Sequence, residues 1–505
     1  MKRSVLIIML LCTLLSARTM WVRIYYDGDL EKEILLNKNY DILTGNARAG
    51  YFEYFLDEKL VNELESQGFG IEILHPDIIN YLEENYGHLR MNFGYYYTYD
   101  EMVQELDQIA ANYPNITHKV SLGQSWQNRE IWAMKISDNA SQNEAEPTVL
   151  ITGVHHAREP IGTSTCIDFI KWLVNNYGTN DTATTIVTTD EVWIVPCVNP
   201  DGYVFNETYE DPWGNGWRKN CRDNNNSGQM EPESDGVDLN RNYGYMWGYD
   251  NNGSSPDPTS ETYRGPSAFS EPETQAMRVL CDTFAFLYAL NYHSYGNYLI
   301  VPWGYINDWV PAPDSATYHV MAESMTTYIG VPNNYTWGTA GQTVGYNANG
   351  VSDDWMYGEQ TEKPKCLAFT AEVGESFWQG ATDSSIIVTH CNETRPMNIY
   401  LCYKAAILGI QEKDEPVALS NLAVFPNPAD AGVNIRFNLA QSTGLKLRLY
   451  DATGRLVVDT KEVRYPAGSN SAVLSLEELS SGIYFLGIFK GSEEVLRNKL
   501  IVVRR

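Results

Sequence analysis

The 505-residue sequence lacks the patterns that mark several common classes of protein. None of its eight cysteines forms a Cys-x-x-Cys pair, which argues against a cysteine zinc site. Beyond the N-terminus no apolar stretch is long enough for a membrane helix, and there is no internal repeat. Basic residues are few, since 36 Lys and Arg stand against 64 Asp and Glu, for a formal net charge of −28. Such a chain repels phosphate backbones, so we expect no nucleic-acid partner.

The N-terminus has the pattern of a secretory signal peptide. Lys2 and Arg3 precede an apolar run over residues 5–15, and two small residues follow it. We therefore predict a signal peptide over residues 1–17 and a secreted protein, located outside the cell or at its surface. Seven cysteines remain after the signal, so at least one thiol is free, and the sequence does not fix their pairing.

The rest of the chain divides into three folded parts. Residues 18–90 combine strand-like stretches with a helical one, which predicts a small α+β domain. Residues 91–411 alternate buried apolar runs with helical patterns, which indicates an α/β domain whose central mixed sheet has helices on both faces. After a linker at 412–419, residues 420–505 alternate apolar and polar residues between turns, as in an all-β sandwich.

The middle part contains clear helix and strand signals. A helix begins after Thr98, which forms a capping-box pattern with Glu101, and a longer helical pattern covers residues 161–175. Short continuous apolar runs predict buried strands. These runs are residues 148–152, 192–198, 286–292 and 366–371.

Three of the predicted strands end in residues that bind metals or move protons. His156 and Glu159 follow the first run, His293 ends the third, and Glu372 follows the fourth. Because ligands of open α/β sheets bind beyond the carboxyl ends of the strands, we expect these side chains to meet. Two histidines, one carboxylate and an open fourth position form a catalytic zinc site, and a further carboxylate is its general base.

A second His-x-x-Glu pair, His390 and Glu393, shows why the motif alone is weak evidence. Such a pair should arise by chance roughly once in every two chains of this length. It lies in a helical stretch rather than at the end of a strand, so we interpret it as structural.

The stretch from about residue 97 to 409 resembles the zinc carboxypeptidase family of pancreatic carboxypeptidases A and B, and is most similar to the bacterial carboxypeptidase T branch. The resemblance implies an enzyme that removes residues one at a time from the C-termini of peptides and proteins. The motifs that carry it are GVHHAREP (153–160), NPDGY (199–203), WRKN (217–220), GVDLNRNY (236–243), ETYRGPSAFSEPET (261–274), NYHSYG (291–296), SDDW (352–355) and FTAEVGESF (369–377).

The resemblance also implies a role for each site residue. One zinc ion is held by His156, Glu159 and His293, while Glu372 acts as general base and Arg218 polarises the scissile carbonyl. An arginine can grip a carboxylate through two parallel hydrogen bonds, and a free carboxylate exists only at a chain end, so such a clamp makes an exopeptidase. The substrate-binding residues that it implies are Arg158, Asn240, Arg241 and Tyr346.

Specificity and a second metal are left open by the sequence. The Asp353-Asp354 pair resembles carboxypeptidases that remove basic residues, in which the first acid lies in the pocket for the departing side chain. We expect a preference for C-terminal Lys or Arg through Asp353, although the carboxypeptidase T branch accepts apolar residues as well. The acidic loop 223–235 has the oxygen ligands that suit Ca²⁺, which that branch also implies, but a solvated loop is an equal alternative.

The flanking parts also have family counterparts. Residues 18–90 stand where relatives carry an activation propeptide, so we predict that they cover the cleft and are cut near Arg90; a permanent accessory domain is the alternative. The last part resembles the sorting domains of type IX secretion cargo through FPNPA (425–429), LYDATGRLV (449–457) and SSGIYFLGI (480–488). This implies contact with an outer-membrane secretion machinery, and an adhesive module is the alternative.

Two rival functions remain. The first is a hydrolase of the same fold that trims peptidoglycan stem peptides, against which the Asp353 pocket and the Arg241 clamp speak. The second is an inactive homologue that acts as a binding module, which would require the loss of a ligand or of the base. The sequence retains all of them.

Overall fold

The structure is a computed structural model, and it divides into two compact units, residues 1–409 and 410–505. It describes residues 18–36, 38, 40, 42–77, 93–209, 215–328, 335–413, 419–440, 442–451, 455–490 and 493–504. The predicted signal peptide, the predicted cleavage near Arg90 and most of the predicted linker lie outside the described residues.

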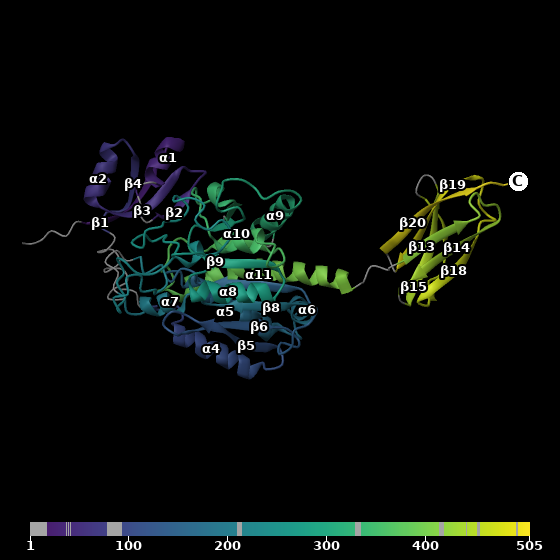
Figure 1. Cartoon of the computed structure of the whole chain (residues 1–505), viewed down its shortest axis with the longest axis horizontal. Coiled ribbons are helices and arrows are strands. Elements are labelled where there is room, and N and C mark those ends of the chain that lie inside the picture. Colours follow the sequence, from purple (N-terminus) through teal and green to yellow (C-terminus); the bar gives the residue numbers. More distant parts are fainter. Residues whose placement is uncertain are drawn as a thin grey trace, which may run out of the picture. The chain divides into compact units, whose positions relative to one another are not determined.

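An eight-stranded mixed sheet forms the centre of the first unit, in the order β11-β10-β12-β9-β7-β8-β6-β5 (Figure 1). Its four middle strands, β12, β9, β7 and β8, run parallel, so their carboxyl ends lie at the same edge. The strands are β5 (Thr117–Gln124), β6 (Glu130–Ile136), β7 (Thr148–Gly153), β8 (Glu191–Val195), β9 (Phe286–His293), β10 (Tyr298–Ile300), β11 (Thr336–Gly338) and β12 (Leu367–Glu372).

Helices pack on both faces of this sheet, which confirms the predicted α/β class (Figure 1). On β7, Val149 and Ile151 join a core with α4, α5 and α11, whereas Leu150 joins the opposite core with α8 and α10. The helices are α4 (Tyr99–Asn112), α5 (Ile161–Asn176), α6 (Asp181–Thr189), α7 (Pro200–Asn206), α8 (Pro272–Thr283), α9 (Asp314–Glu323), α10 (Ser352–Gly358) and α11 (Ser384–Lys413), with short turns η1 (Leu239–Arg241), η2 (Ser324–Tyr328) and η3 (Ala340–Gln342).

Local sequence signals located these elements well. The capping box at the start of α4 is confirmed, because Thr98 Oγ1 accepts the Glu101 N–H at 3.2 Å and the Glu101 carboxylate accepts the Thr98 N–H at 2.9 Å. One expected strand was too long: β8 ends at Val195 rather than continuing through residue 198. Pro196 has no N–H to continue the ladder.

A small α+β domain precedes the central sheet in the same unit. Its antiparallel sheet has the order β2-β3-β1-β4, and α2 buries Val61 and Leu64 against it. The elements are β1 (Thr19–Tyr25), α1 (Asp29–Leu36), β2 (Ile42–Asn46), β3 (Tyr51–Asp57), α2 (Glu58–Ser66) and β4 (Gly70–His75).

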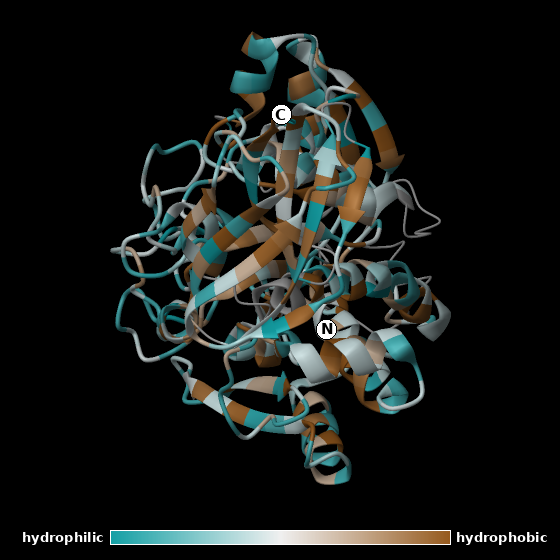
Figure 2. Cartoon of the chain, turned by 90° about the vertical axis from the view of Figure 1, so that its right-hand side faces the viewer, coloured by the Kyte–Doolittle hydropathy of each residue, from teal (hydrophilic) through white to brown (hydrophobic). Residues whose placement is uncertain are grey.

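The second unit is built of strands in two sheets, β13-β14-β18 and β16-β15-β19-β20, with β17 paired to β15. Inward residues such as Leu447 and Leu449 on β15 form one apolar core, and hydrophobic and hydrophilic bands alternate along the strands (Figure 2). The strands are β13 (Leu419–Phe425), β14 (Gly432–Leu439), β15 (Thr443–Asp451), β16 (Leu456–Asp459), β17 (Val463–Tyr465), β18 (Gly468–Ser475), β19 (Gly482–Lys490) and β20 (Glu493–Val502).

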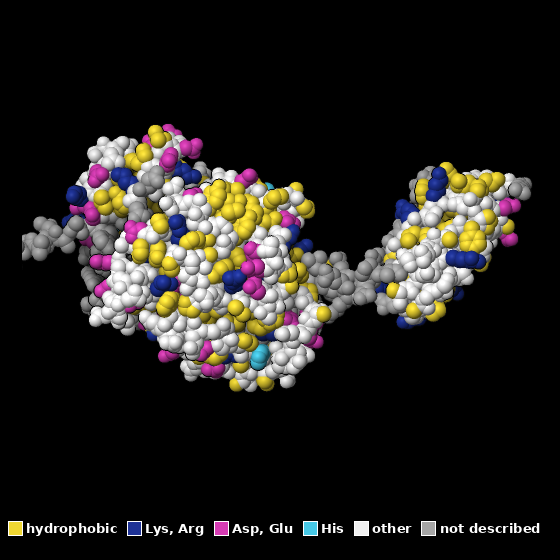
Figure 3. All heavy atoms as spheres, in the orientation of Figure 1, with side chains coloured by type: hydrophobic (Ala, Val, Ile, Leu, Met, Phe, Trp, Pro, Cys, Tyr) yellow, Lys and Arg dark blue, Asp and Glu magenta, His cyan; other side chains and the backbone are white. Residues whose placement is uncertain are grey.

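The helices and the surface charge show two further features. Over the described ranges, none of the helices combines the length and the apolar character needed to cross a bilayer. On the face that Figure 3 shows, acidic side chains of the first unit are scattered among other types and form no single broad patch.

Candidate metal and active site

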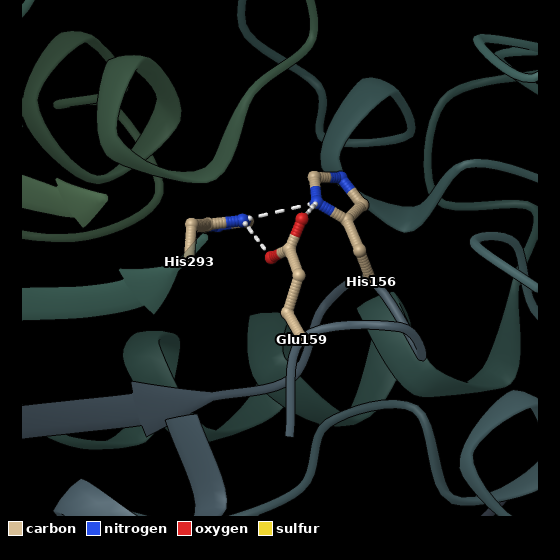
Figure 4. A group of neighbouring side chains, drawn as sticks. All are labelled: His156, Glu159 and His293. Carbon is tan, nitrogen blue, oxygen red and sulfur yellow. Dashed lines mark hydrogen bonds and ion pairs between the residues drawn. The ribbon is translucent and has the colours of Figure 1, made fainter. Parts of the chain in front are cut away.

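His156, Glu159 and His293 direct their ligand atoms toward one point (Figure 4). His156 Nδ1 lies 2.8 Å from Glu159 Oε1, and His293 Nδ1 lies 3.0 Å from Glu159 Oε2. The two Nδ1 atoms are 3.1 Å apart, and all three side chains are buried. The other group of potential ligands found among the described residues, at Asp138, Glu144 and Glu146, holds carboxylates alone and is largely exposed.

The three ligand atoms fit a zinc ion by chemistry and by spacing. Bonds of about 2.0–2.1 Å in a tetrahedral site place neighbouring ligand atoms about 3.3 Å apart, close to the separations seen here. The opposite nitrogen of each histidine has an outer partner, as metal-bound imidazoles usually do. His156 Nε2 lies 3.2 Å from Asp238 Oδ1, and His293 Nε2 lies 3.4 Å from Asn240 Nδ2.

The parallel strands bring these residues together. Glu372 at the end of β12 pairs in register with His293 at the end of β9. The adjacent β7 ends at Gly153, and the next residue, Val154, has a φ of 56°. A β-branched residue rarely adopts this left-handed conformation, so the turn that presents His156 stores backbone strain of a kind found at functional sites.

Asp238 connects the candidate metal ligand His156 to two arginines, and sequence reasoning missed it. Its Oδ1 contacts His156, while its Oδ2 accepts hydrogen bonds from Arg218 Nε at 3.0 Å and Nη2 at 2.8 Å. Burial would raise the pKa of Asp238, but the Arg218 and Arg241 guanidinium groups outweigh it and hold the pKa well below its usual range. The signal for it was its place in GVDLNRNY, two residues before Asn240.

Glu372 has the opposite environment. Burial and the neighbouring Glu159 carboxylate raise the pKa of Glu372 well above its usual range, against the lowering effect of Arg218 and Arg241. A cation held beside it would lower this pKa. The pKa of Glu372 is thus raised, whereas that of Asp238 is lowered. Two carboxylates whose pKa values are pushed apart are a frequent sign of separate roles in one active site.

All of the predicted substrate-binding residues except Arg158 line one small cavity of about 60 Å³ beside the candidate metal ligands. Arg158 does not line the cavity. Its guanidinium stacks at 4.5 Å over the ring of Phe377, and Phe377 does line the cavity. The predicted site residues that line the cavity are His156, Glu159, Arg218, Asn240, Arg241, Tyr346, Asp353 and Glu372.

The two adjacent acids of α10 differ in their surroundings. Asp354 accepts the backbone N–H groups of Gly304 at 2.8 Å and Tyr305 at 3.1 Å, so it fixes the chain behind the cavity wall. Asp353 lines the cavity, and burial raises its pKa to about 6.

Comparison with known proteins agrees with this geometry. Residues 102–394, more than half of the chain, match the family model described as zinc carboxypeptidase. The chain belongs to the zinc carboxypeptidase family. Residues 423–503 match the model described as a secretion system C-terminal sorting domain. The zinc carboxypeptidase family consists of zinc-dependent peptide hydrolases, so the first unit has the fold of a metallocarboxypeptidase.

Relatives and solved structures support the assignment. The chain is 30% identical over 277 residues to a zinc carboxypeptidase of Saccharothrix mutabilis subsp. capreolus, covering 52% of this chain and 59% of that relative. It is 30% identical over 309 residues to mouse carboxypeptidase A2, covering 58% of this chain and 69% of that relative. The fold resembles carboxypeptidase A from Helicoverpa armigera, with a TM-score of 0.66 and 24% identity over 79% of this chain and all of that one. It also resembles a structure of thrombin activatable fibrinolysis inhibitor, with a TM-score of 0.62 and 20% identity. That match covers 78% of this chain and all of that one.

The N-terminal α+β domain places β2 in the cleft of the carboxypeptidase domain. Ile42, Leu43 and Thr44 line the cavity, and Leu43 packs with Tyr295 and Phe377. Three hydrogen bonds join the two domains at this strand. Thr44 Oγ1 donates to Tyr295 O at 3.1 Å, Tyr298 Oη donates to Gly45 O at 2.8 Å, and Ala47 N donates to Thr343 O at 2.9 Å.

The acidic loop and the second His-x-x-Glu pair make internal contacts and do not form a converging group of metal ligands like the one above. In loop 223–235, Asp223 accepts the N–H groups of Ser227 and Gly228, and Asp235 accepts those of Asn224 and Glu231. Within the part of this loop that the structure describes, no three acidic side chains converge as a metal site would require. His390 and Glu393 lie on α11 and contact each other at 3.2 Å, as a structural pair would.

Proposed function

We propose that this chain is a secreted zinc metallocarboxypeptidase that hydrolyses the C-terminal peptide bond of peptides and proteins. The observation that carries the proposal is the convergence of two histidines and a glutamate next to a cavity that Glu372 and Arg218 line. Zinc, when bound by His156, Glu159 and His293, supplies a Lewis acid and lowers the pKa of water toward about 7.

Glu372 and Arg218 perform the proton and charge work. The Glu372 carboxylate accepts a proton from the attacking water, and its position beside His293 at the strand ends supports this role. Arg218 faces the negative charge that develops on the scissile carbonyl oxygen, where one preorganised donor contributes about 3 kcal/mol. Asp238 orients Arg218 through two hydrogen bonds, so no reorganisation is needed during the reaction.

The free carboxylate of the substrate is bound by Asn240, Arg241 and Tyr346. Arg241 uses one of its five N–H donors on Asn240 O at 2.8 Å, which fixes the guanidinium at the cavity wall. Asn240 Oδ1 accepts the Ser352 N–H at 2.9 Å, which orients its amide. Arg158, stacked on Phe377, contacts the substrate further from the chain end.

Asp353 selects the departing residue. A carboxylate that lines the pocket favours a Lys or Arg side chain and disfavours an apolar one, because an apolar side chain would leave the charge desolvated and unpaired. The neighbouring Asp354 already has two backbone donors, which supports Asp353 as the selector.

The flanking domains control when and where the enzyme acts. The N-terminal domain acts as a propeptide, since β2 fills part of the cleft that a substrate needs, and a cut near Arg90 releases it. The C-terminal domain directs the chain to a secretion machinery of the outer membrane, as its match to a sorting domain suggests. Calcium is not part of this proposal, because no three acidic side chains of the described loop 223–235 converge on one point.

The decisive assay measures amino-acid release by the secreted chain after proteolytic removal of the N-terminal domain. Matched peptides ending in Arg, Lys, Phe and Leu are compared with and without a zinc chelator, and Glu372→Gln is the inactive control. Chelator-sensitive release of Arg and Lys alone supports the mechanism and the role of Asp353. Release of all four residues would retain the mechanism but remove that role, and no release from zinc-loaded protein would refute the proposal.

A further inference from the structure

His155 lies beside the proposed zinc ligands without being one of them. Its ring is fully buried and lies almost parallel to that of His293, with centroids 5.4 Å apart and planes inclined by 18°. Its Nε2 lies 2.8 Å from Tyr243 Oη. Its backbone carbonyl accepts a hydrogen bond from Asn199 Nδ2 at 3.2 Å. The ring is therefore held at its edge by Tyr243 and covers one face of His293.

His293 needs such a contact more than His156 does. The terminal torsion of a histidine ring is broad, so neighbours have to define the plane of the ring. The edge of His156 meets a buried carboxylate of Asp238, a charge-assisted partner. The edge of His293 meets only the neutral amide of Asn240 at 3.4 Å, a long contact. His156 meets the His293 ring at an inclined angle of 59°, whereas His155 lies almost parallel to it, so the face packed against His155 is a further restraint on the plane of His293.

Tyr243 is a firm anchor for this arrangement. It is fully buried, and its ring packs against Trp355 and Phe269 with centroid distances of 5.6 and 5.7 Å. Its backbone N–H donates to Gly350 O at 2.9 Å. The hydroxyl that holds His155 therefore has little freedom to move.

Fold stability alone does not account for a histidine at position 155. Among the contacts of the described residues, its Nδ1 has no hydrogen-bond partner. A buried polar atom left in this state costs about 1–3 kcal/mol. An apolar ring of the same size would fill the space without that cost but could not bond to Tyr243.

We infer that His155 is a positioning residue, which is tethered by Tyr243 and holds the ring of His293 in the plane needed to bind zinc. This inference rests on the proposed zinc site and adds a residue that the three ligands and their outer partners leave out. Removing an outer residue that hydrogen-bonds to a metal ligand typically changes metal affinity by about 10- to 100-fold, and we expect the loss of this ring contact to fall at the lower end of that range.

The test uses the full-length chain and follows the metal rather than turnover. His155→Gln keeps a group able to bond to Tyr243 but removes the ring, and Tyr243→Phe removes only the hydroxyl. His319→Gln is the matched control, because His319 also stacks on an aromatic ring, at 4.1 Å from Trp309, but lies on α9. Zinc release into excess chelator is timed, and the visible absorption of the cobalt-substituted protein is recorded.

We expect His155→Gln to release zinc at least about 10-fold faster and to shift the cobalt absorption. Tyr243→Phe should release zinc several-fold faster, and the control should match the parent chain. Urea unfolding of the metal-free proteins separates this effect from a general loss of stability, which would not move the cobalt absorption of folded protein.

Wild-type release rates and cobalt absorption in both folded variants would overturn the inference. If His155→Gln does not fold, Tyr243→Phe alone decides in the same way. A parent chain that binds no zinc would instead refute the proposed function itself.

Discussion

Gly45 is the position where one added methyl group should separate the N-terminal domain from the cleft. A Cβ at this residue of β2 would lie 2.0 Å from Val344 O and 2.6 Å from Cδ1 of Phe52. Real Cβ contacts are essentially never shorter than 3.0 Å, and one of these two neighbours is backbone. Gly45→Ala therefore forces β2 away from the loop that carries Tyr346.

The expected size of the effect follows from the contacts that this shift weakens. The three interdomain hydrogen bonds at Thr44, Gly45 and Ala47 each contribute about 0.5–1.5 kcal/mol net. Overpacking of this kind typically costs about 1–3 kcal/mol. Because about 1.4 kcal/mol changes an equilibrium tenfold, the undocked population should rise roughly 5- to 150-fold.

The assay compares hydrolysis of a short peptide ending in Arg by the uncleaved chains. Gly45→Ala should be more active than the parent by this factor until the undocked form predominates, and the two should be equal once the N-terminal domain is removed. Gly70→Ala on β4 is the matched control, since its Cβ would meet only Tyr25 Cβ at 3.7 Å. A folded, uncleaved Gly45→Ala chain with parental activity would refute the proposed inhibition by docking of β2.

Three further outcomes are expected. Asp353→Asn should lower kcat/KM for C-terminal Arg about 100-fold or more relative to Phe, because a buried cation without its partner costs about 3–5 kcal/mol. Asp308→Asn is the control, since Asp308 is exposed. An unchanged ratio of kcat/KM for Arg and Phe would exclude Asp353 as the selector. Since burial raises the pKa of Asp353 to about 6, the preference for Arg in the parent enzyme should weaken as the pH falls below about 6, and a flat ratio down to pH 5 would contradict this. Burial, with Glu271 and Asp201 nearby, raises the pKa of Glu273 to about 8, so the folded state holds this proton where the unfolded state releases it. The free energy of unfolding should then decline by about 1.4 kcal/mol per pH unit from the unfolded pKa of Glu273 up to about 8. In urea titrations, Glu273→Gln should remove that part of the slope, whereas Glu362→Gln, at an exposed position, should leave it unchanged.

The candidate metal ligands and the proposed general base show how far local patterns reach. His156, Glu159, His293 and Glu372 were found because each follows an apolar run, and parallel strands align their carboxyl ends wherever they pair. The structure places β7, β9 and β12 side by side and thereby confirms the shared edge. Helix α4 was equally predictable, since a capping box depends only on residues three positions apart.

Residues that act through others were harder to find. Asp238 and His155 belong to motifs, but their partners are 82 and 88 residues away in the chain. No periodicity or spacing signals such a contact. For Asp353 and Asp354 the family resemblance predicts the first as the pocket acid, and the structure adds the reason: Asp353 lines the cavity, whereas Gly304 and Tyr305 hold Asp354.

By itself the sequence determined the α/β class, the ends of the main strands, and the residue types that hold a metal, because these depend on short-range patterns of burial and backbone hydrogen bonding. Only the tertiary structure decided which carboxylate orients Arg218, how Asp354 is held by backbone N–H groups while Asp353 lines the cavity, and that Gly45 lets β2 enter the cleft. Those outcomes depend on the separation of atoms brought together from distant parts of the chain, and a difference of one methyl group or one ångström is enough to reverse them.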